Sequence, residues 1–286
     1  MSSAVPALTV VGSVNLDFVV RLPRLPVAGE TVTEGLLAIH PGGKGANQAL
    51  AARRMGADVS LVAAVGNDAH AEAAVELLRA AGVNLDRCWS FEGAATGVAL
   101  VMVGERGENQ IGVAPGANRL LTSDVLELTP DEAVLCQLEV PLETVEAAAR
   151  TSTGFFALNA APARPLPSAV LTRADLLIVN EVERDFYHEQ LEAVPGLVVV
   201  TMGGAGAVAF RRGRPVAQAA PPQVEVVDTV GAGDAFVGAF TVSLLEGMGL
   251  EPALTRACAA GALAASRPGA QPSLPTAADV DAIMGR

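Results

Sequence analysis

The chain has 286 residues, of which 51% are hydrophobic and 17% charged, and its net charge is −12. This length and hydrophobicity allow a large buried core and exclude a disordered chain. The 31 acidic residues against 19 basic ones would repel phosphate backbones and anionic lipids. We therefore expect neither nucleic acid nor a membrane surface as a partner.

The cysteines and the N-terminal region indicate a reduced, cytoplasmic location. The three cysteines are odd in number and lack the spacing of a metal site, so we expect neither a disulfide framework nor zinc. The N-terminus has no charged segment before its first apolar run, unlike a signal peptide. The most apolar stretch, 193–210, is interrupted by Pro195 and several glycines, which predicts strand, turn and strand rather than a membrane span.

Short β-branched segments alternate with alanine-rich segments along most of the chain, which is typical of a parallel sheet covered by helices on both faces. Right-handed crossovers make a doubly wound sheet the simplest topology. We predict one α/β domain over 1–286. The predicted strands are 8–11, 59–65, 133–138, 155–158, 176–179 and 197–201, and the predicted helices are 45–54, 69–80, 142–150, 182–190, 234–246 and 252–266.

Two regions interrupt this alternation. Residues 18–21 with 31–39, and 96–103 with 110–113, look like antiparallel pairs. We expect a small antiparallel β lid, contributed from about 17–39 and 96–114. The exposed edges of such a sheet favour a homodimer formed through the lid.

The segment 228–234 reads Asp-Thr-Val-Gly-Ala-Gly-Asp and runs into a predicted helix. Gly231, Ala232 and Gly233 leave backbone N–H groups bare at a helix N-terminus, where an anion is favoured. Asp234 stands at the rim of this anion hole and could take a proton from a hydroxyl that attacks a phosphoryl group. Taken alone, the segment could also be an N-cap Asp behind a flexible turn.

Lys44 is the only lysine in a chain with 18 arginines. It lies in the run 40–48, His-Pro-Gly-Gly-Lys-Gly-Ala-Asn-Gln, whose glycines permit close backbone approach at a helix entry. The run is not a phosphate-binding Walker loop. Lys44 and Asn47 could instead hold a polyol, the alternative being a solvated lysine at a helix start.

Polar residues follow the other predicted strands. Asn15 and Asp17 alternate after the first strand, and Glu139 follows the strand 133–138, where open α/β sheets bind ligands. Asn180 and Glu183 follow 176–179 and could hold the water shell of Mg²⁺ on nucleotide phosphates, although a helix capping box explains the pair equally well. The glycine-rich run 201–206 suits either a nucleotide or a tight turn.

Together these motifs resemble the ribokinase-like, phosphofructokinase-B family of carbohydrate kinases. The likeness extends over residues 10–284. Its most specific parts are the glycine pair with Lys44 and Asn47, and the segment from Asp228 to Asp234. Within the family, the runs 15–17, 42–49 and 137–139 look most like the members that phosphorylate D-ribose on its 5-hydroxyl with ATP.

The resemblance implies specific roles. Asp234 is the base, and Gly231, Ala232 and Gly233 stabilise the transferring phosphoryl group. The implied sugar-binding residues are Asn15, Leu16, Asp17, Gly43, Lys44, Gly45, Ala46, Asn47, Glu139 and Asp234. The implied ATP-binding residues are Asn180, Thr201, Met202, Gly203, Gly204, Ala205, Gly206, Gly233 and Cys258.

It also implies two kinds of metal ion. Asn180 and Glu183 would organise Mg²⁺ through water. An activating K⁺ would contact Asp228, Val230, Ala264, Arg267, Gly269 and Ser273, mainly through backbone oxygens. The chain departs from the family in having only 17 residues between Glu183 and Thr201, and in having Cys258 near the expected adenine.

Three alternatives stay open at this point. The chain could be a related kinase acting on fructose, 2-keto-3-deoxygluconate or a nucleoside. A non-catalytic sugar-binding regulator is less favoured, because binding alone needs no base at Asp234. A dinucleotide-dependent oxidoreductase is disfavoured because Gly12-Ser13-Val14-Asn15 does not match the glycine pattern required after the first strand.

Overall fold

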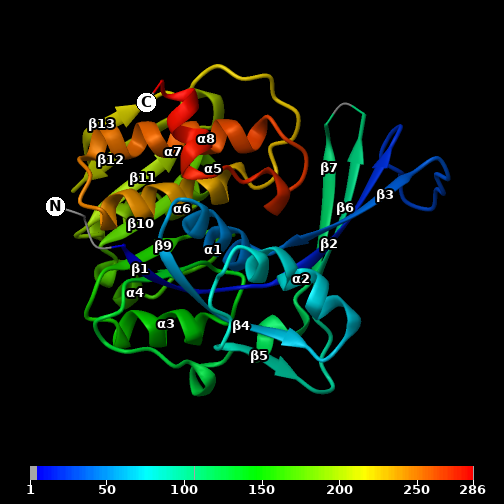
Figure 1. Cartoon of the computed structure of the whole chain (residues 1–286), viewed down its shortest axis with the longest axis horizontal. Helices are drawn as coiled ribbons and strands as arrows, with labels where there is room; N and C mark the ends of the chain where they lie inside the picture. The colour runs from blue at the N-terminus through cyan, green and yellow to red at the C-terminus, as the bar shows by residue number, and fades with distance from the viewer. Residues whose placement is uncertain (1–4, 106, 286) are drawn as a thin grey trace.

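A nine-stranded sheet forms the centre of the fold, and a four-stranded sheet projects from it (Figure 1). This holds for residues 5–105 and 107–285, the part of the chain that the computed structural model describes. The large sheet contains β1 (Ala7–Val11), β4 (Asp58–Gly66), β5 (Cys88–Phe91), β8 (Val134–Cys136), β9 (Phe156–Asn159), β10 (Leu176–Asn180), β11 (Leu197–Thr201), β12 (Ala207–Arg211) and β13 (Arg214–Ala219).

The strand order in the large sheet is β13-β12-β11-β10-β9-β8-β1-β4-β5. All pairs from β11 to β5 are parallel, and only the β11–β12 and β12–β13 pairs at one edge are antiparallel. After β1 the chain builds β4 and β5 on one side and then returns to β8 on the other. The order therefore reverses between β1 and β8, and ligands bind open α/β sheets at such a reversal.

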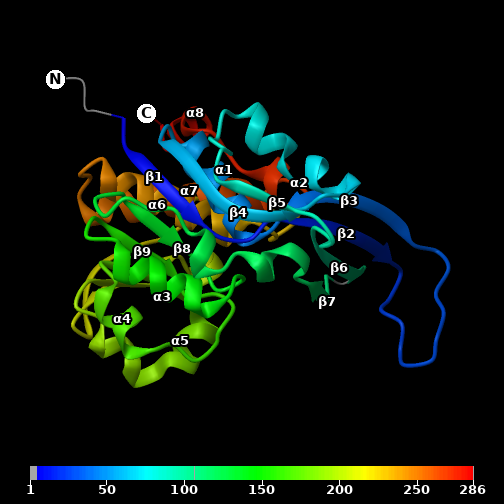
Figure 2. The same ribbon diagram turned by 90° about the horizontal axis from the view of Figure 1, so that it is seen from below.

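Helices cover both faces of the large sheet (Figure 2). Alternate residues of β1 and β4 point to opposite faces, so Val10 and Leu61 pack in one cluster while Val11 and Val62 pack in the other. The first face is covered by α1 (Lys44–Arg54), α2 (Ala69–Ala80), α6 (Ala232–Leu245), α7 (Leu250–Ala265) and α8 (Ala277–Ile283), and the second by α3 (Leu142–Thr151), α4 (Ser168–Arg173) and α5 (Glu181–Tyr187). The predicted doubly wound α/β fold is confirmed.

The four-stranded sheet is the predicted lid. It contains β2 (Asn15–Leu22), β3 (Leu36–Gly42), β6 (Gly97–Gly104) and β7 (Asn109–Ala114), in the order β3-β2-β6-β7. Both hairpins are antiparallel, as predicted, and they are joined by parallel pairing of β2 with β6. The sheet extends away from the body on the side of α2 (Figure 1).

The prediction of a strand over 31–39 was wrong at both ends. Residues 31–35 form no strand, whereas β3 continues beyond Ile39 through His40 and Pro41 to Gly42. Pro41 lacks an N–H donor and argues against an internal strand. It is tolerated because β3 lies at the edge of the lid.

Other differences concern short elements. The helix predicted over 182–190 ends at Tyr187, and a 3₁₀-helix, η3 (His188–Ala193), follows it. His188 begins that change with φ of 40°, outside the α-helical region. The elements β5, β13, α4 and α8 were not predicted, because each is short and has little periodicity. Among residues 5–105 and 107–285, no helix has the length and apolarity to span a bilayer.

Candidate active site

Asp234 lies in the first turn of α6, at the reversal point of the large sheet. The N-cap residue Gly231 has φ of +81°, a conformation that glycine adopts without strain. A methyl group on Gly231 would lie 3.0 Å from Cα of Ala270, so the backbones approach closely here. No described side chain caps this helix. The N–H of Ala232, predicted to be free, instead donates to the carbonyl of Thr229 over 3.2 Å. The N–H groups of Gly233 and Asp234 are the donors of the first turn that an anion could use.

Two amide side chains of α1 hold the Asp234 carboxylate. Nδ2 of Asn47 donates to Oδ2 over 2.8 Å, and Nε2 of Gln48 donates to Oδ1 over 2.8 Å. Burial raises the pKa of Asp234, whereas the charge of Lys44 and the two amide bonds oppose that rise. The result is a buried carboxylate with a raised pKa beside a helix N-terminus, the environment expected of a general base.

Asn15 and Glu139 are fixed by polar partners from neighbouring segments. Oδ1 of Asn15 accepts from Nδ2 of Asn118 over 2.8 Å, and Asn118 also bonds both backbone groups of Val14. One oxygen of Glu139 accepts from the hydroxyl of Ser13 over 2.5 Å and from the N–H of Lys44 over 3.0 Å. Both predicted sugar ligands therefore have restricted positions before any ligand binds.

Asp17 is the least satisfied carboxylate of the site. Its Oδ1 is buried and has no hydrogen-bond partner in the described chain. Burial, with repulsion from Glu139 and Asp234, raises its pKa to about 7. The backbone of Gly42 lies directly against it, because a methyl group there would be 2.1 Å from Oδ2. An unpaired buried acceptor of this kind is costly unless a ligand hydroxyl donates to it.

Lys44 brings a positive charge into this group of carboxylates. Its Nζ lies 3.9 Å from Oε1 of Glu139, and its side chain remains about one-third exposed, at 32%. Burial lowers its pKa, but attraction by four carboxylates, of which Asp234 and Glu139 contribute most, outweighs burial and raises it. The ammonium therefore stays charged and faces the space between these acids.

Asn180 and Glu183 form the capping box that was the alternative interpretation of this pair. The Asn180 side chain accepts from the N–H of Glu183 over 2.9 Å, and the Glu183 carboxylate accepts from the N–H of Asn180 over 2.8 Å. Burial raises the pKa of Glu183, and Lys44 counteracts this. Only one carboxylate oxygen is used in the cap. The pair therefore fits Mg²⁺ held through water, and that role stays a prediction.

The predicted nucleotide-binding run follows β11. Met202 and Gly206 close a tight turn over η4 (Gly203–Ala205), with the N–H of Met202 bonded to the carbonyl of Gly206 over 2.8 Å. Gly206 packs on the backbone of Ala219, and Sγ of Cys258 lies 3.6 Å from the Ala219 carbonyl. The structure thus brings this turn and Cys258 of α7 to the same place, at the end of β13.

Three of the residues predicted to hold K⁺, Asp228, Val230 and Gly269, are joined by hydrogen bonds. The Asp228 carboxylate accepts from the N–H groups of Val230 and Gly269, each over 3.0 Å. Its own N–H donates to the carbonyl of Ala265, next to Ala264. Among the described residues, no group of three or more His, Cys, Asp or Glu side chains could hold a metal ion. Backbone oxygens would have to supply this site, as the resemblance implies, and the K⁺ site stays a prediction.

Some predicted sugar-binding residues offer only their backbone. Leu16 and Ala46 are buried in the core. The N–H of Ala46 bonds the Ser13 carbonyl over 2.9 Å, and the N–H of Gly45 lies 3.4 Å from the Ser13 hydroxyl. Gly43 has φ of +87° and packs against the backbone of Asn15 and Ser13. These residues shape the turn that positions Lys44.

Several polar residues in contact with the site were not predicted. Ser13 and Asn118 hold the sugar-facing residues, whereas Gln48, Gln137 and Asn159 lie behind Asp234. Gln48 and Gln137 have no exposed surface, and each lies next to a residue or strand end that we had selected. The sequence signal that could have identified Gln48 and Gln137 was a glutamine beside a candidate ligand or at the end of a predicted buried strand.

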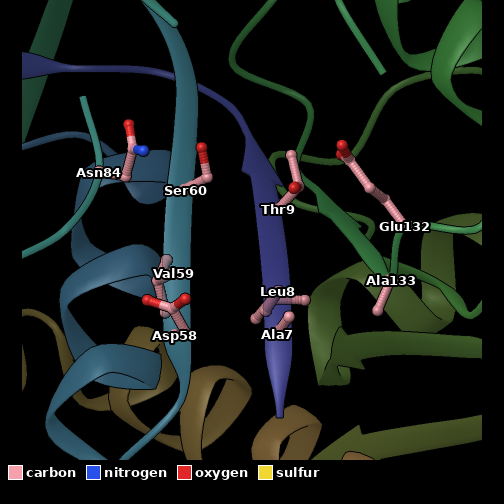
Figure 3. Close-up of a pocket in the computed structure, with 9 residues that line it drawn as sticks. All are labelled: Ala7, Leu8, Thr9, Asp58, Val59, Ser60, Asn84, Glu132 and Ala133. Carbon is pink, nitrogen blue, oxygen red and sulfur yellow. The ribbon is translucent and has the colours of Figure 1, made fainter. Parts of the chain in front are cut away.

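A separate hollow of the described surface lies elsewhere. It has a volume of about 230 Å³ and is lined by residues at the amino ends of β1 and β4 and before β8 (Figure 3). Thr9, Ser60 and Glu132 face it, together with Asn84 (Figure 3). The carboxyl ends of the same strands lead to Asp17 and Glu139. The hollow therefore lies at the amino ends of these strands, whereas the site lies at their carboxyl ends.

Comparison with known proteins agrees with this geometry. Residues 6–277 match the pfkB family of carbohydrate kinases, and the chain belongs to that family. Its members are kinases that transfer a phosphoryl group to a sugar hydroxyl. The chain is 36% identical to a ribokinase of Bacillus subtilis, over 97% of this chain and 99% of the relative.

Solved structures show the same similarity. A ribokinase of Thermotoga maritima superposes with a TM-score of 0.89 at 30% identity, over 98% of this chain and all of the other. A ribokinase of Arabidopsis thaliana, solved with ribose and ATP, gives a TM-score of 0.82 at 31% identity, over 99% and 100% of the two chains.

Proposed function

We propose that this chain phosphorylates D-ribose on its 5-hydroxyl, with ATP as the donor. The observation that carries the proposal is the Asp234 carboxylate, held by two amides at the uncapped start of α6. A hydroxyl beside this carboxylate loses its proton to Asp234 as its oxygen attacks the terminal phosphorus of ATP, and the bond from that phosphorus to the bridging oxygen breaks to release ADP. N–H groups of the helix start stabilise the charge on the group in transfer.

The sugar would be held by groups that currently have free bonding capacity. Asp17 Oδ1 and Asn47 Oδ1 are buried acceptors that have no partner among the described residues, and a polyol supplies the hydroxyl donors they require. Lys44, whose Nζ lies 3.9 Å from Oε1 of Glu139 and which Asp234 also attracts, supplies hydrogen-bond donors to the same hydroxyls. This complementarity to several adjacent hydroxyls supports a small sugar as the acceptor.

ATP would lie over the turn 201–206, with Cys258 behind it and its phosphates directed toward α6. Mg²⁺ would be held through water by Asn180 and Glu183, where it would neutralise charge on the phosphates. K⁺ would be held by backbone oxygens near Asp228 and Gly269. Asp228 accepts hydrogen bonds from the N–H groups of Val230 and Gly269. These bonds hold the two loops together, which supports a K⁺ site formed by both.

We further propose a homodimer formed through the lid. Leu36 and Ile39 of β3, Leu100 of β6, and Ile111 and Val113 of β7 are large apolar side chains that are all exposed. Exposed apolar groups concentrated on one small sheet favour association. We also retain the cytoplasm as the proposed location, in keeping with the unpaired cysteines of the described chain.

A coupled assay of ADP release tests the proposed reaction. Ribose, 2-deoxyribose, fructose, 2-keto-3-deoxygluconate and adenosine are compared as acceptors, and we expect ribose to give the highest kcat/KM. Asp234→Asn should lower kcat by about 100-fold or more, with a smaller change in KM for ribose. A better acceptor from the panel would replace ribose in the proposal. Near-normal turnover by Asp234→Asn would refute the assignment of the base.

A further inference from the structure

A chain of three buried amides lies behind Asp234. Nε2 of Gln137 donates to Oε1 of Gln48 over 2.7 Å, and Nε2 of Gln48 donates to Oδ1 of Asp234 over 2.8 Å. The same Nε2 donates to Oδ1 of Asn159 over 2.9 Å. Both glutamines are completely buried, and Asn159 is 8% exposed. These residues come from the ends of β8 and β9 and from α1, and they converge on one carboxylate.

The orientation of each amide is fixed by its neighbour. An ionised carboxylate only accepts hydrogen bonds, so Gln48 must turn its NH₂ toward Asp234. Its carbonyl oxygen then faces Gln137, which must donate in turn. Nδ2 of Asn159 is bonded to the Ile178 carbonyl over 3.2 Å, which leaves its oxygen facing Gln48. Reversing Gln48 would place its oxygen against the acceptor oxygens of Asp234 and Asn159, and its NH₂ against the donor NH₂ of Gln137. The hydrogen bonds of the three amides therefore have only one possible direction, with the last donor facing Asp234.

Gly12 makes room for this arrangement. A methyl group on Gly12 would lie 2.0 Å from Oε1 of Gln137 and 2.7 Å from Cα of Gly45. The residue after β1 must therefore be glycine for Gln137 and the start of α1 to lie this close. In a dry interior, hydrogen bonds in series polarise one another, so the donor bond from Gln48 is strengthened by the bond from Gln137.

We propose that Gln48, oriented by Gln137, is a positioning residue that fixes the rotation and the ionised state of the base Asp234. The inference rests on the proposed function, which assigns Asp234 as the base. Asn47 holds one carboxylate oxygen and Gln48 the other, so neither alone fixes the plane of the group. A base turned out of plane would meet the sugar hydroxyl in poor geometry.

Substitutions that keep shape but remove the donors test this inference. Gln48→Met should lower kcat for ribose and ATP by about 10- to 100-fold, a range found for groups that orient reactive ones, and change KM for ribose about twofold. The acid limb of the kcat/KM profile should move to higher pH, because a bond that favours the ionised carboxylate is lost. Gln137→Met should produce the same changes at smaller size.

Thr241→Val is the matched control. Thr241 lies two turns beyond Asp234 on α6 and is fully buried, and its hydroxyl has no partner in the part of the chain that the structure describes. Its replacement removes a buried polar group outside the amide chain and should leave kcat and the pH profile unchanged. The melting temperature is measured for every variant, since a purely structural role would change melting temperature without changing the pH profile.

Gln48→Glu provides a second measurement if Gln48→Met does not fold. The glutamate keeps the shape and the bond from Gln137, but when ionised it faces Asp234 with a second negative charge. We expect a larger loss of kcat than in the methionine variant at pH 8, with partial recovery as the pH falls and the new side chain can donate. A wild-type pH profile in Gln48→Met or Gln48→Glu would overturn the inference, while an inactive Asp234→Asn would leave the base assigned. Full turnover in Asp234→Asn would instead overturn the base itself.

Discussion

Nη2 of Arg21, on lid strand β2, lies 3.5 Å from Oδ2 of Asp228 in the loop before α6. The same carboxylate accepts from the backbone of Val230 and Gly269. One side chain of the body therefore links the lid to both loops of the predicted K⁺ site. The Arg21 side chain is 52% exposed, so the ion pair itself contributes at most about 1 kcal/mol to stability.

The first prediction concerns the positive charge of Arg21. Arg21→Ala should lower the KCl concentration for half-maximal activity by about threefold or more, because a cation that repels K⁺ is removed from Asp228. The melting temperature should change little. The measurement is kcat against KCl concentration at constant ionic strength. Arg24→Ala is the control, since Arg24 pairs with Glu30 within the lid. An equal KCl dependence in wild type and Arg21→Ala would show that the guanidinium does not act on a cation there.

The second prediction concerns Asp17, whose pKa is raised from 3.8 to about 7 by burial and by nearby acids. The folded protein holds this proton up to about pH 7, whereas the unfolded chain releases it near pH 4. Stability is therefore lost as the pH rises through this window. Asp17→Asn cannot titrate and should gain on the order of 2 kcal/mol over wild type at pH 8, with a smaller difference at pH 5.

Melting curves at pH 5 and pH 8 without ribose provide the comparison. The variant should melt about 4 °C or more above wild type at pH 8. Calorimetry should show ribose binding weakened by about 2 kcal/mol or more, with ATP binding nearly unchanged, because a charged acceptor is lost. An equal melting difference at both pH values would contradict a raised pKa. Equal losses for ribose and ATP would mean that Asp17 supports the fold.

The sequence predicted those parts of the site that depend on local pattern. The glycine-rich entries to α1 and α6 identify Lys44, Asn47 and Asp234, because close approach and a bare helix start require small residues. The amide chain behind Asp234 could not be predicted in this way. Gln137 and Gln48 are 89 positions apart, and Gln48 and Asp234 are 186 apart, so only the folded sheet brings them together.

The errors in the fold have a similar origin. The predicted strand stopped before Pro41, a residue that disfavours an internal strand. The sequence does not reveal that β3 is an edge strand, where a proline is tolerated. The helix after Asn180 was predicted too long because its capping box marks where it begins. Its end is set by the change of backbone conformation at His188.

The third prediction compares two glycines at opposite ends of α1. Gly43 and Gly56 both have positive φ, at +87° and +100°, but only Gly43 is enclosed. A methyl group on Gly43 would lie 2.8 Å from the Asn15 nitrogen and 2.9 Å from the Ser13 oxygen, whereas one on Gly56 would meet nothing within 4 Å. Gly56→Ala should lower the free energy of unfolding by about 1 kcal/mol, because alanine is strained in this backbone conformation. Gly43→Ala should cost about 2 kcal/mol more, because backbone atoms must move.

Chemical denaturation measures both costs, and ribose titration adds a functional readout. Only Gly43→Ala should weaken ribose binding, since the displaced segments carry Asn15 and Lys44. If the two alanine variants have the same stability and the same ribose affinity, the close packing at Gly43 does not position the site.

The last prediction concerns Lys44, the only lysine of the chain. Its ammonium lies 3.9 Å from Glu139 and is attracted by several carboxylates, so it remains charged. If the site required only a positive charge, arginine would serve, and this chain uses arginine at every other basic position. A compact ammonium donates to hydroxyls in a space that the larger, planar guanidinium does not fit. Lys44→Arg should therefore raise KM for ribose about tenfold or more and leave the melting temperature near that of wild type.

Amine-selective labelling tests the same role of Lys44 without a substitution. Besides the N-terminal amine, Lys44 offers the only primary amine, so a single modified peptide reports on it. The side chain is about one-third exposed, at 32%, and should react in the absence of sugar. Saturating ribose should slow the reaction because the hydroxyls cover the ammonium, whereas a sugar that is not phosphorylated should not. Labelling at an unchanged rate with ribose, or wild-type kinetics in Lys44→Arg, would show that Lys44 is a solvated residue rather than a sugar ligand.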